Sequence, residues 1–211
     1  MSEAFPTVAL LSISGGFQDA YTYLAREHVF ANAQTGNVVL LSANAVSGNW
    51  EGLLRYLVPL VFFSLGVAVA ELIWGHYRER GRLHWRQRVI LLEILLLFLS
   101  GLLPPEQNVL ANSIVSFSCA MQVQTFRKVN GQAFASTMCI GNLRSGIDLL
   151  CVFFREREPL VLRQAGTYFS IILLFALGAG IGGAVIPYWG LLSIWASCGL
   201  LTVSFLLMLP D

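Results

Sequence analysis

Charged residues are scarce in this 211-residue chain, where Asp, Glu, Lys and Arg together make up only 12% of the sequence. A soluble domain carries about 25% charged residues. Hydrophobic residues instead reach 56%, and the mean hydropathy is +0.68. This composition excludes an ordinary soluble domain and predicts an integral membrane protein, so the lipid bilayer is its first expected partner.

The chain also lacks the motifs of common enzyme classes. It has no Walker loop, dinucleotide fingerprint, HExxH or GxSxG sequence, and no basic and aromatic stripe for nucleic acid. Its histidines, His28, His76 and His84, have no metal-ligand spacing, and its four cysteines stand alone in apolar stretches. We therefore expect no enzymatic activity, no cofactor, no metal site and no nucleic-acid partner.

What is present is a series of apolar segments. A helix needs about 20 residues to cross a hydrocarbon core of about 30 Å. Six segments are long enough, or nearly so: Phe5–Ala25, Leu53–Gly75, Val89–Leu103, Val109–Phe126, Gln164–Ile186 and Gly190–Leu209. Two further apolar segments, Val38–Val46 and Met138–Phe154, are either half-helices that enter and return or additional spans, which would make eight.

The basic residues favour six spans. Five arginines share one loop, which the positive-inside rule places in the cytoplasm: Arg78, Arg80, Arg82, Arg86 and Arg88. With six spans, five later basic residues fall on the same side, namely Arg127, Lys128, Arg155, Arg157 and Arg163. Arg26 and Arg55 then fall outside, whereas eight spans would move three more arginines there. We expect six spans with both termini in the cytoplasm.

A short polar motif occurs twice, 105 positions apart. Asp19 corresponds to Gln124, Gly36 to Gly141, and Asn37 to Asn142. Each half contains three predicted spans, and because that number is odd the second half must insert upside down. We predict an all-α, polytopic transmembrane bundle in one membrane domain, with inverted-topology repeats of about residues 1–104 and 107–209.

Gly36-Asn37 stands directly before Val38–Val46, and Gly141-Asn142 lies near the start of Met138–Phe154, where the chain is expected to turn and return through Leu143–Phe154. Glycine permits a turn, and asparagine is a strong N-cap for the helix that follows. A helix N-terminus carries about half a positive charge and unpaired N–H donors. Two such ends meeting at the midplane would attract an anion or the carbonyl or carboxylate group of a solute. The alternative is that each motif starts an amphipathic helix lying flat on the membrane.

Asp19 lies in the middle of the first predicted span, where a carboxylate costs at least about 2.5 kcal/mol. It is predicted either to act as a proton- or cation-coupling group or a solute contact, or to form a structural ion pair or hydrogen bond, for instance with Arg144. The flanking polar residues either line a polar path or make interhelical hydrogen bonds. The candidate solute or ion site comprises Asp19, Gln18, Tyr23, Thr35, Gly36, Asn37, Gln122, Gln124, Gly141, Asn142 and Arg144.

Other residues have ordinary structural interpretations. Arg144 and Asp148, spaced i and i+4 on one helix face, are expected to form a salt bridge. Glu71 and Glu93 are expected to pair with the arginine-rich loop. The small residues Gly66, Ala70, Gly178 and Gly182 are expected to permit close helix packing, either within the fold or in a homo-oligomer.

The stretch from Gly16 to Tyr23, followed by Phe30 and by Thr35-Gly36-Asn37-Val38, resembles the YoaK family of bacterial membrane proteins. That family has the pattern G-x-x-D-A-x-x-Y, followed by F and then by T-G-N. The resemblance to this chain extends over almost the whole length of the family. The second half departs from it, since Gln122 and Thr125 replace a glycine and an asparagine, and Ile140 replaces a threonine. The resemblance implies an inner-membrane protein without a known substrate.

We therefore expect a small secondary transporter or facilitator for an unidentified small solute, with a midplane site between the repeats and Asp19 as the protonatable group. A passive channel for a small neutral solute or anion is one alternative. A non-transporting scaffold or regulatory subunit is another. A wet cavity that reaches Asp19 and Asn37 would favour transport, and a dry centre would favour the scaffold.

Overall fold

The computed structural model describes residues 4–77, 84–129, 131–134 and 136–209. Arg78, Arg80 and Arg82 of the predicted cytoplasmic loop lie outside these residues. The helices are α1 (Phe5–Ala25), α2 (Gln34–Val46), α3 (Trp50–Tyr77), α4 (Trp85–Leu102), α5 (Asn108–Thr125), α6 (Cys139–Glu156), α7 (Pro159–Trp189) and α8 (Trp195–Leu207), with short 3-10 helices η1 (Pro105–Gln107) and η2 (Gly190–Ile194). A small antiparallel hairpin joins β1 (Lys128–Val129) to β2 (Gln132–Ala133). The all-α prediction is confirmed, apart from this hairpin.

The helix bounds follow the apolar segments but differ in detail. α1 has the predicted bounds, whereas α3 and α7 extend over 28 and 31 residues. Pro187 lies inside α7, near its end. A proline near a helix end removes only one late hydrogen bond, so the helix continues, and the chain turns at Gly190, whose φ of 54° suits glycine. By length and composition, α3 and the helical run Pro159–Leu207 qualify as membrane-spanning candidates among the described residues.

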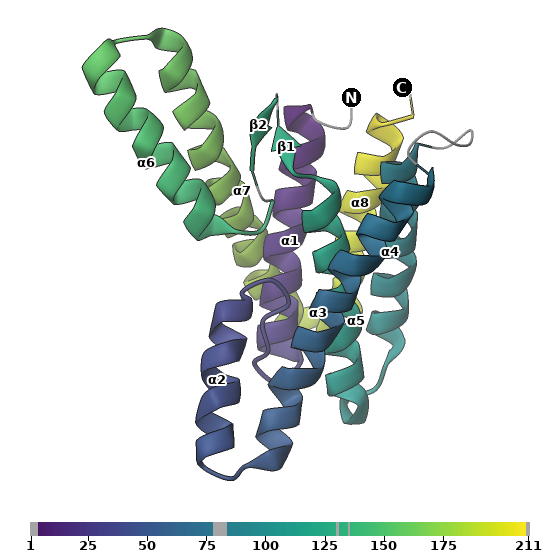
Figure 1. The fold of residues 1–211 in the computed structure, drawn as a ribbon. Helices are drawn as coiled ribbons and strands as arrows, with labels where there is room; N and C mark the ends of the chain where they lie inside the picture. The colour runs from purple at the N-terminus through teal and green to yellow at the C-terminus, as the bar shows by residue number, and fades with distance from the viewer. Residues whose placement is uncertain (1–3, 78–83, 130, 135, 210–211) are drawn as a thin grey trace.

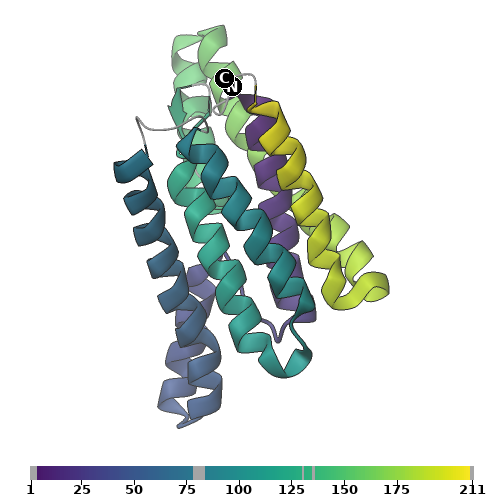
Figure 2. The ribbon, with the colours of Figure 1, turned by 90° about the vertical axis from the view of Figure 1, so that its right-hand side faces the viewer.

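The helices form a bundle with two projecting hairpins. The most extensive packing joins α1 to α7 and α3 to α5, while α4 lies against α5 and α8, and α8 lies against α1. α2 runs beside α3, and α6 runs beside α7 (Figure 1). These two hairpins project from opposite ends of the bundle, and α1 begins at the same end at which α8 stops (Figures 1 and 2).

Small residues allow the two main helix pairs to approach closely. A Cβ atom at Gly16 of α1 would overlap the carbonyl group of Phe175 in α7, and one at Gly178 of α7 would overlap that of Ile13. Gly66 of α3 meets the carbonyl group of Phe117 in α5 in the same way. The predicted role of Gly66 and Gly178 in close packing within the fold is confirmed, and Gly16 has the same role without having been predicted.

Arg26 closes one end of the bundle core. Its side chain is fully buried, although the sequence placed it in an outside loop. The guanidinium donates to the carbonyl oxygens of Ser100 (2.8 Å) and Leu103 (2.9 Å) and to Oδ1 of Asn108 (3.0 Å). Ser100 lies in the last turn of α4, and Leu103 is the C-cap residue that follows it. The Ser100 carbonyl also accepts from the Leu103 N–H (3.3 Å), and the Arg26 cation adds charged donors at this helix end, where carbonyls lack their usual intrahelical partners.

A candidate solute site between two short helices

A cavity of about 760 Å³ lies where the starts of α2 and α6 meet α1, α3 and α7. Its polar lining comes from Asp19, Tyr23, Asn32, Gln34, Thr35 and Thr137. Its other walls are largely apolar, with Leu24, Phe30, Phe63, Met138, Ile140, Phe175 and Ala179 among them. The cavity therefore combines one carboxylate and several neutral polar groups with aromatic and aliphatic walls, which suits a small solute that is partly apolar.

Asp19 is held at the edge of this cavity with only 8% of its surface exposed. Its Oδ1 accepts hydrogen bonds from the backbone N–H of Asn32 (2.7 Å) and from the Asn32 side-chain amide (3.5 Å). The predicted alternative, an ion pair with Arg144, is wrong. Arg144 is 86% exposed and lies 4.0 Å from Asp148, which confirms the expected i,i+4 pair.

Asn37 ties the start of α2 to the loop before it. Its side chain is fully buried, with Oδ1 accepting from the Phe30 N–H (3.1 Å) and Nδ2 donating to the Phe30 carbonyl (2.6 Å). The prediction that Asn37 is an N-cap is therefore wrong, because α2 begins at Gln34 and Asn37 lies within its first turn. Gly36 adopts helical conformation and lets the Phe30 ring approach. The turn thus precedes the Gly-Asn pair.

The second Gly-Asn pair occupies the same place in α6. This helix begins at Cys139, so Asn142 also lies in the first turn and is not an N-cap. Asn142 is buried, while Ile140 and Gly141 line the cavity. The residue 105 positions after Phe30 is residue 135, which lies outside the described residues. The starts of both short helices therefore reach one cavity, as the duplicated motif predicts.

Three predicted site residues lie away from the cavity and make interhelical contacts instead. Gln18 is buried in the bundle, where its carbonyl oxygen accepts from the Cys119 thiol of α5 (2.8 Å) and its amide donates to Ser14 Oγ of its own helix (2.9 Å). Gln122 donates to the Leu11 carbonyl (3.2 Å) and to Ser136 Oγ (3.0 Å). Gln124 donates to Glu71 Oε2 (2.9 Å), which lies on another cavity. For these glutamines the structure favours the interhelical alternative over a polar path.

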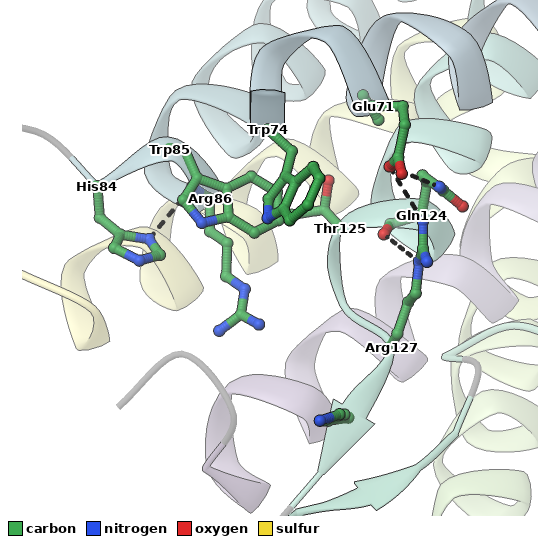
Figure 3. Close-up of a pocket in the computed structure, with 10 residues that line it drawn as sticks. Glu71, Trp74, His84, Trp85, Arg86, Gln124, Thr125 and Arg127 are labelled. Carbon is green, nitrogen blue, oxygen red and sulfur yellow. Dashed lines mark hydrogen bonds and ion pairs between the residues drawn. The ribbon is translucent and has the colours of Figure 1, made fainter. Parts of the chain in front are cut away.

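The other cavity measures about 580 Å³ and is shown in Figure 3. Gln124, Ala70 and Trp74 line it, and each is 105 positions from a residue of the first cavity, namely Asp19, Phe175 and Ala179. The two cavities therefore occupy equivalent places in the two halves. Glu71 was predicted to pair with the arginine-rich loop, but its ion pair is with Arg127 (3.1 Å), which lies outside that loop. The second cavity thus carries an ion pair, whereas the first carries the Asp19 carboxylate.

Comparison with known proteins identifies the family of this chain. A family model described as "Protein of unknown function (DUF1275)" matches residues 7–207. The chain belongs to the DUF1275 family. A curated relative from Bacillus subtilis (strain 168), the UPF0700 transmembrane protein YoaK, is 26% identical over 194 residues, which is 89% of this chain and 86% of the relative. No solved structure matches the chain. The resemblance to the YoaK family is thereby confirmed, and this DUF1275 protein is a membrane protein.

Sequence reasoning missed one group in this DUF1275 chain. Glu93 lies in α4, and the prediction that it pairs with the arginine-rich loop is wrong. Its side chain is fully buried, and neither carboxylate oxygen has a hydrogen-bond partner in the described part of the chain. The signal was present, because Glu93 interrupts an apolar run, as Asp19 does, and such a residue in a membrane helix faces the protein interior.

Proposed function

We propose that this DUF1275 protein is a small secondary transporter or facilitator in the bacterial inner membrane, and that its solute binds in the cavity beside Asp19. One observation carries the proposal. The cavity brings a carboxylate together with the starts of two short helices that come from equivalent places in the two halves of the chain. Transporter sites at the bilayer midplane are commonly built in this way.

The proposed topology has six spans, α1, α3, α4, α5, α7 and α8, with α2 and α6 as half-helices. At about 1.5 Å per residue, α2 with its 13 residues is too short to span. α6 has 18 residues and runs beside α7 as α2 runs beside α3. With both half-helices returning to the side they entered, α1 begins and α8 ends on one side, which we assign to the cytoplasm on the positive-inside rule.

The proposed inverted repeat is supported by the packing pattern. Exchanging each helix of the first half for its counterpart in the second turns the α1–α7 pair into α5–α3, and the α4–α5 pair into α8–α1. All these pairs are present. The hairpins that project from opposite ends are exchanged as well, and so are the two cavities. An inversion of the second half accounts for each of these relationships.

In the proposed mechanism, Asp19 is the group that changes charge. One of its oxygens is occupied by Asn32, on the loop that leads into α2. Protonation of Asp19 weakens its pull on the Asn32 N–H, because a charged acceptor makes a stronger hydrogen bond than a neutral one. Proton binding would then loosen the loop that forms one wall of the cavity. Solute movement is thereby coupled to proton binding at Asp19 through that loop.

The test uses purified protein in liposomes loaded with a pH-sensitive dye, to which glycerol, urea, acetate and ethylammonium are added in turn. We expect saturable movement of at least one solute class with pH dependence, and loss of that dependence in Asp19→Asn. Asp148→Asn, an exposed carboxylate on α6, is the matched control and should behave as the wild type. Flux without saturation or proton movement would indicate a passive channel. No flux of any solute class would favour the scaffold.

A further inference from the structure

The centre of the bundle holds a second carboxyl group that the cavity does not use. Glu93 of α4 is fully buried, and its two carboxylate oxygens have no hydrogen-bond partner within the described ranges. An ionised carboxylate in an apolar interior is so unfavourable that the group takes up a proton instead. The burial of Glu93 therefore points to a neutral carboxylic acid.

The polar side chain that faces Glu93 is Gln18 of α1. The Gln18 amide nitrogen donates to Ser14 Oγ (2.9 Å), and its carbonyl oxygen accepts from the Cys119 thiol at 2.8 Å. An amide nitrogen carries two protons, so one N–H of Gln18 remains for the Glu93 carboxyl group. Gln18 is followed directly by Asp19, which borders the cavity. A short stretch of α1 thus connects the two carboxyl groups.

Among the described residues, none places a cation beside Glu93. The titratable groups that face it are thiols, Cys119 from α5 and Cys198 from α8. η2 (Gly190–Ile194) carries no titratable side chain, and Glu71 of α3 is paired with Arg127. Cys198 is 105 positions after Glu93, and Cys119 is 105 positions after Ser14. The cluster therefore lies where equivalent helices of the two halves, α4 and α8, pack together.

We propose that Glu93 is a proton-binding site at the centre of the bundle, occupied at neutral pH, and that Gln18 links its protonation to Asp19 at the cavity. When Glu93 loses its proton to water, the negative carboxylate draws the Gln18 amide towards it, and the neighbouring Asp19 moves with the same turn of α1. The proposal of a proton site rests only on the burial of the Glu93 side chain and on the residues around it. Its part in coupling rests on the proposed transport function.

Infrared spectroscopy of the purified wild-type protein tests the proton site without any transported solute. We expect a carbonyl stretching band of a protonated carboxylic acid at neutral pH, which shifts when glutamate alone is labelled with ¹³C at its carboxyl group. Glu93→Gln should remove this band, and the matched control Glu106→Gln, at an exposed position, should keep it. Gln18→Leu should keep the band but shift its frequency, because the carboxyl group then faces a hydrocarbon side chain instead of an amide.

A wild-type spectrum without an acid band that responds to labelled glutamate would overturn the proposal, whether or not any variant folds. The liposome assay then separates the two ideas. If the band is present and no solute moves, the transport proposal fails while the proton site stands. If solute moves with pH dependence and the band is absent, Asp19 acts alone. Loss of pH dependence in Glu93→Gln, with the band assigned to Glu93, supports the link to Asp19.

Discussion

Asn37 holds the peptide group of Phe30 from both sides, accepting a hydrogen bond from its N–H and donating one to its carbonyl oxygen. Asp19 holds the same loop two residues further along, at the N–H of Asn32. The two polar residues of the first motif therefore fix one short segment, which crosses from α1 to α2 and forms a wall of the cavity. Both side chains therefore act as hydrogen-bond partners for the non-helical backbone between α1 and α2, which would otherwise be unsatisfied inside the bundle.

Asn37→Ala should destabilise the protein strongly. The substitution leaves the N–H and carbonyl groups of Phe30 without this partner, and a buried unsatisfied polar group costs about 1–3 kcal/mol. We expect a clear fall in the midpoint of thermal unfolding in detergent. Ser42→Ala, at an exposed position of the same helix, is the control and should change stability by less than about 0.5 kcal/mol. Equal effects of the two substitutions would contradict the assigned role.

Arg26→Met should also be severe. It removes the charged donor to the Ser100 and Leu103 carbonyls at the end of α4, and each hydrogen bond to a charged group contributes about 1.5–3 kcal/mol. Denaturant titration should show a loss of several kcal/mol for Arg26→Met. Arg55→Met breaks a partly exposed pair with Glu27, and such pairs contribute about 0–1 kcal/mol. A loss at Arg55 as large as that at Arg26 would contradict this difference.

Two glycines of α7 should respond in opposite directions to alanine. A Cβ at Gly178 would meet the backbone of Ile13, so Gly178→Ala forces α1 and α7 apart and should cost about 1–3 kcal/mol. Gly183 has nothing within 4 Å of its Cβ position, and Gly183→Ala should stabilise the helix by up to about 1 kcal/mol. Unfolding midpoints of the two variants, measured side by side, check the prediction. Destabilisation by both would argue against close α1–α7 contact.

The cavity beside Asp19 should be reachable from water. In a protein whose four native cysteines are replaced by serine, Thr35→Cys should react rapidly with a charged, membrane-impermeant maleimide. Ser116→Cys, fully buried in α5, is the control and should react far more slowly in folded protein. A Thr35→Cys thiol that resists the charged reagent but reacts with an apolar one would indicate that the cavity opens to lipid rather than to water.

Local sequence patterns predicted the helices well, because the length of an apolar run is a local property. The bounds of α1 were predicted, and the starts of α2 and α6 were wrong by a few residues, since the Gly-Asn pair was taken for the turn. Asn37 looks like an N-cap when only its neighbours along the chain are considered. Its partner, Phe30, lies seven residues back, across a loop whose path the sequence does not specify.

Composition and the length of the apolar runs were sufficient to predict an apolar membrane protein built of helices, because both can be read directly from the chain. Which polar residues meet became evident only in the folded structure. It brought Thr137 and Gly141 beside Asp19, moved Gln124 to the second cavity, and buried Glu93 and Arg26. These outcomes depend on contacts between helices that are far apart in the chain. Whether an isolated charged residue such as Glu93 or Arg26 is buried depends on which helices pack against it.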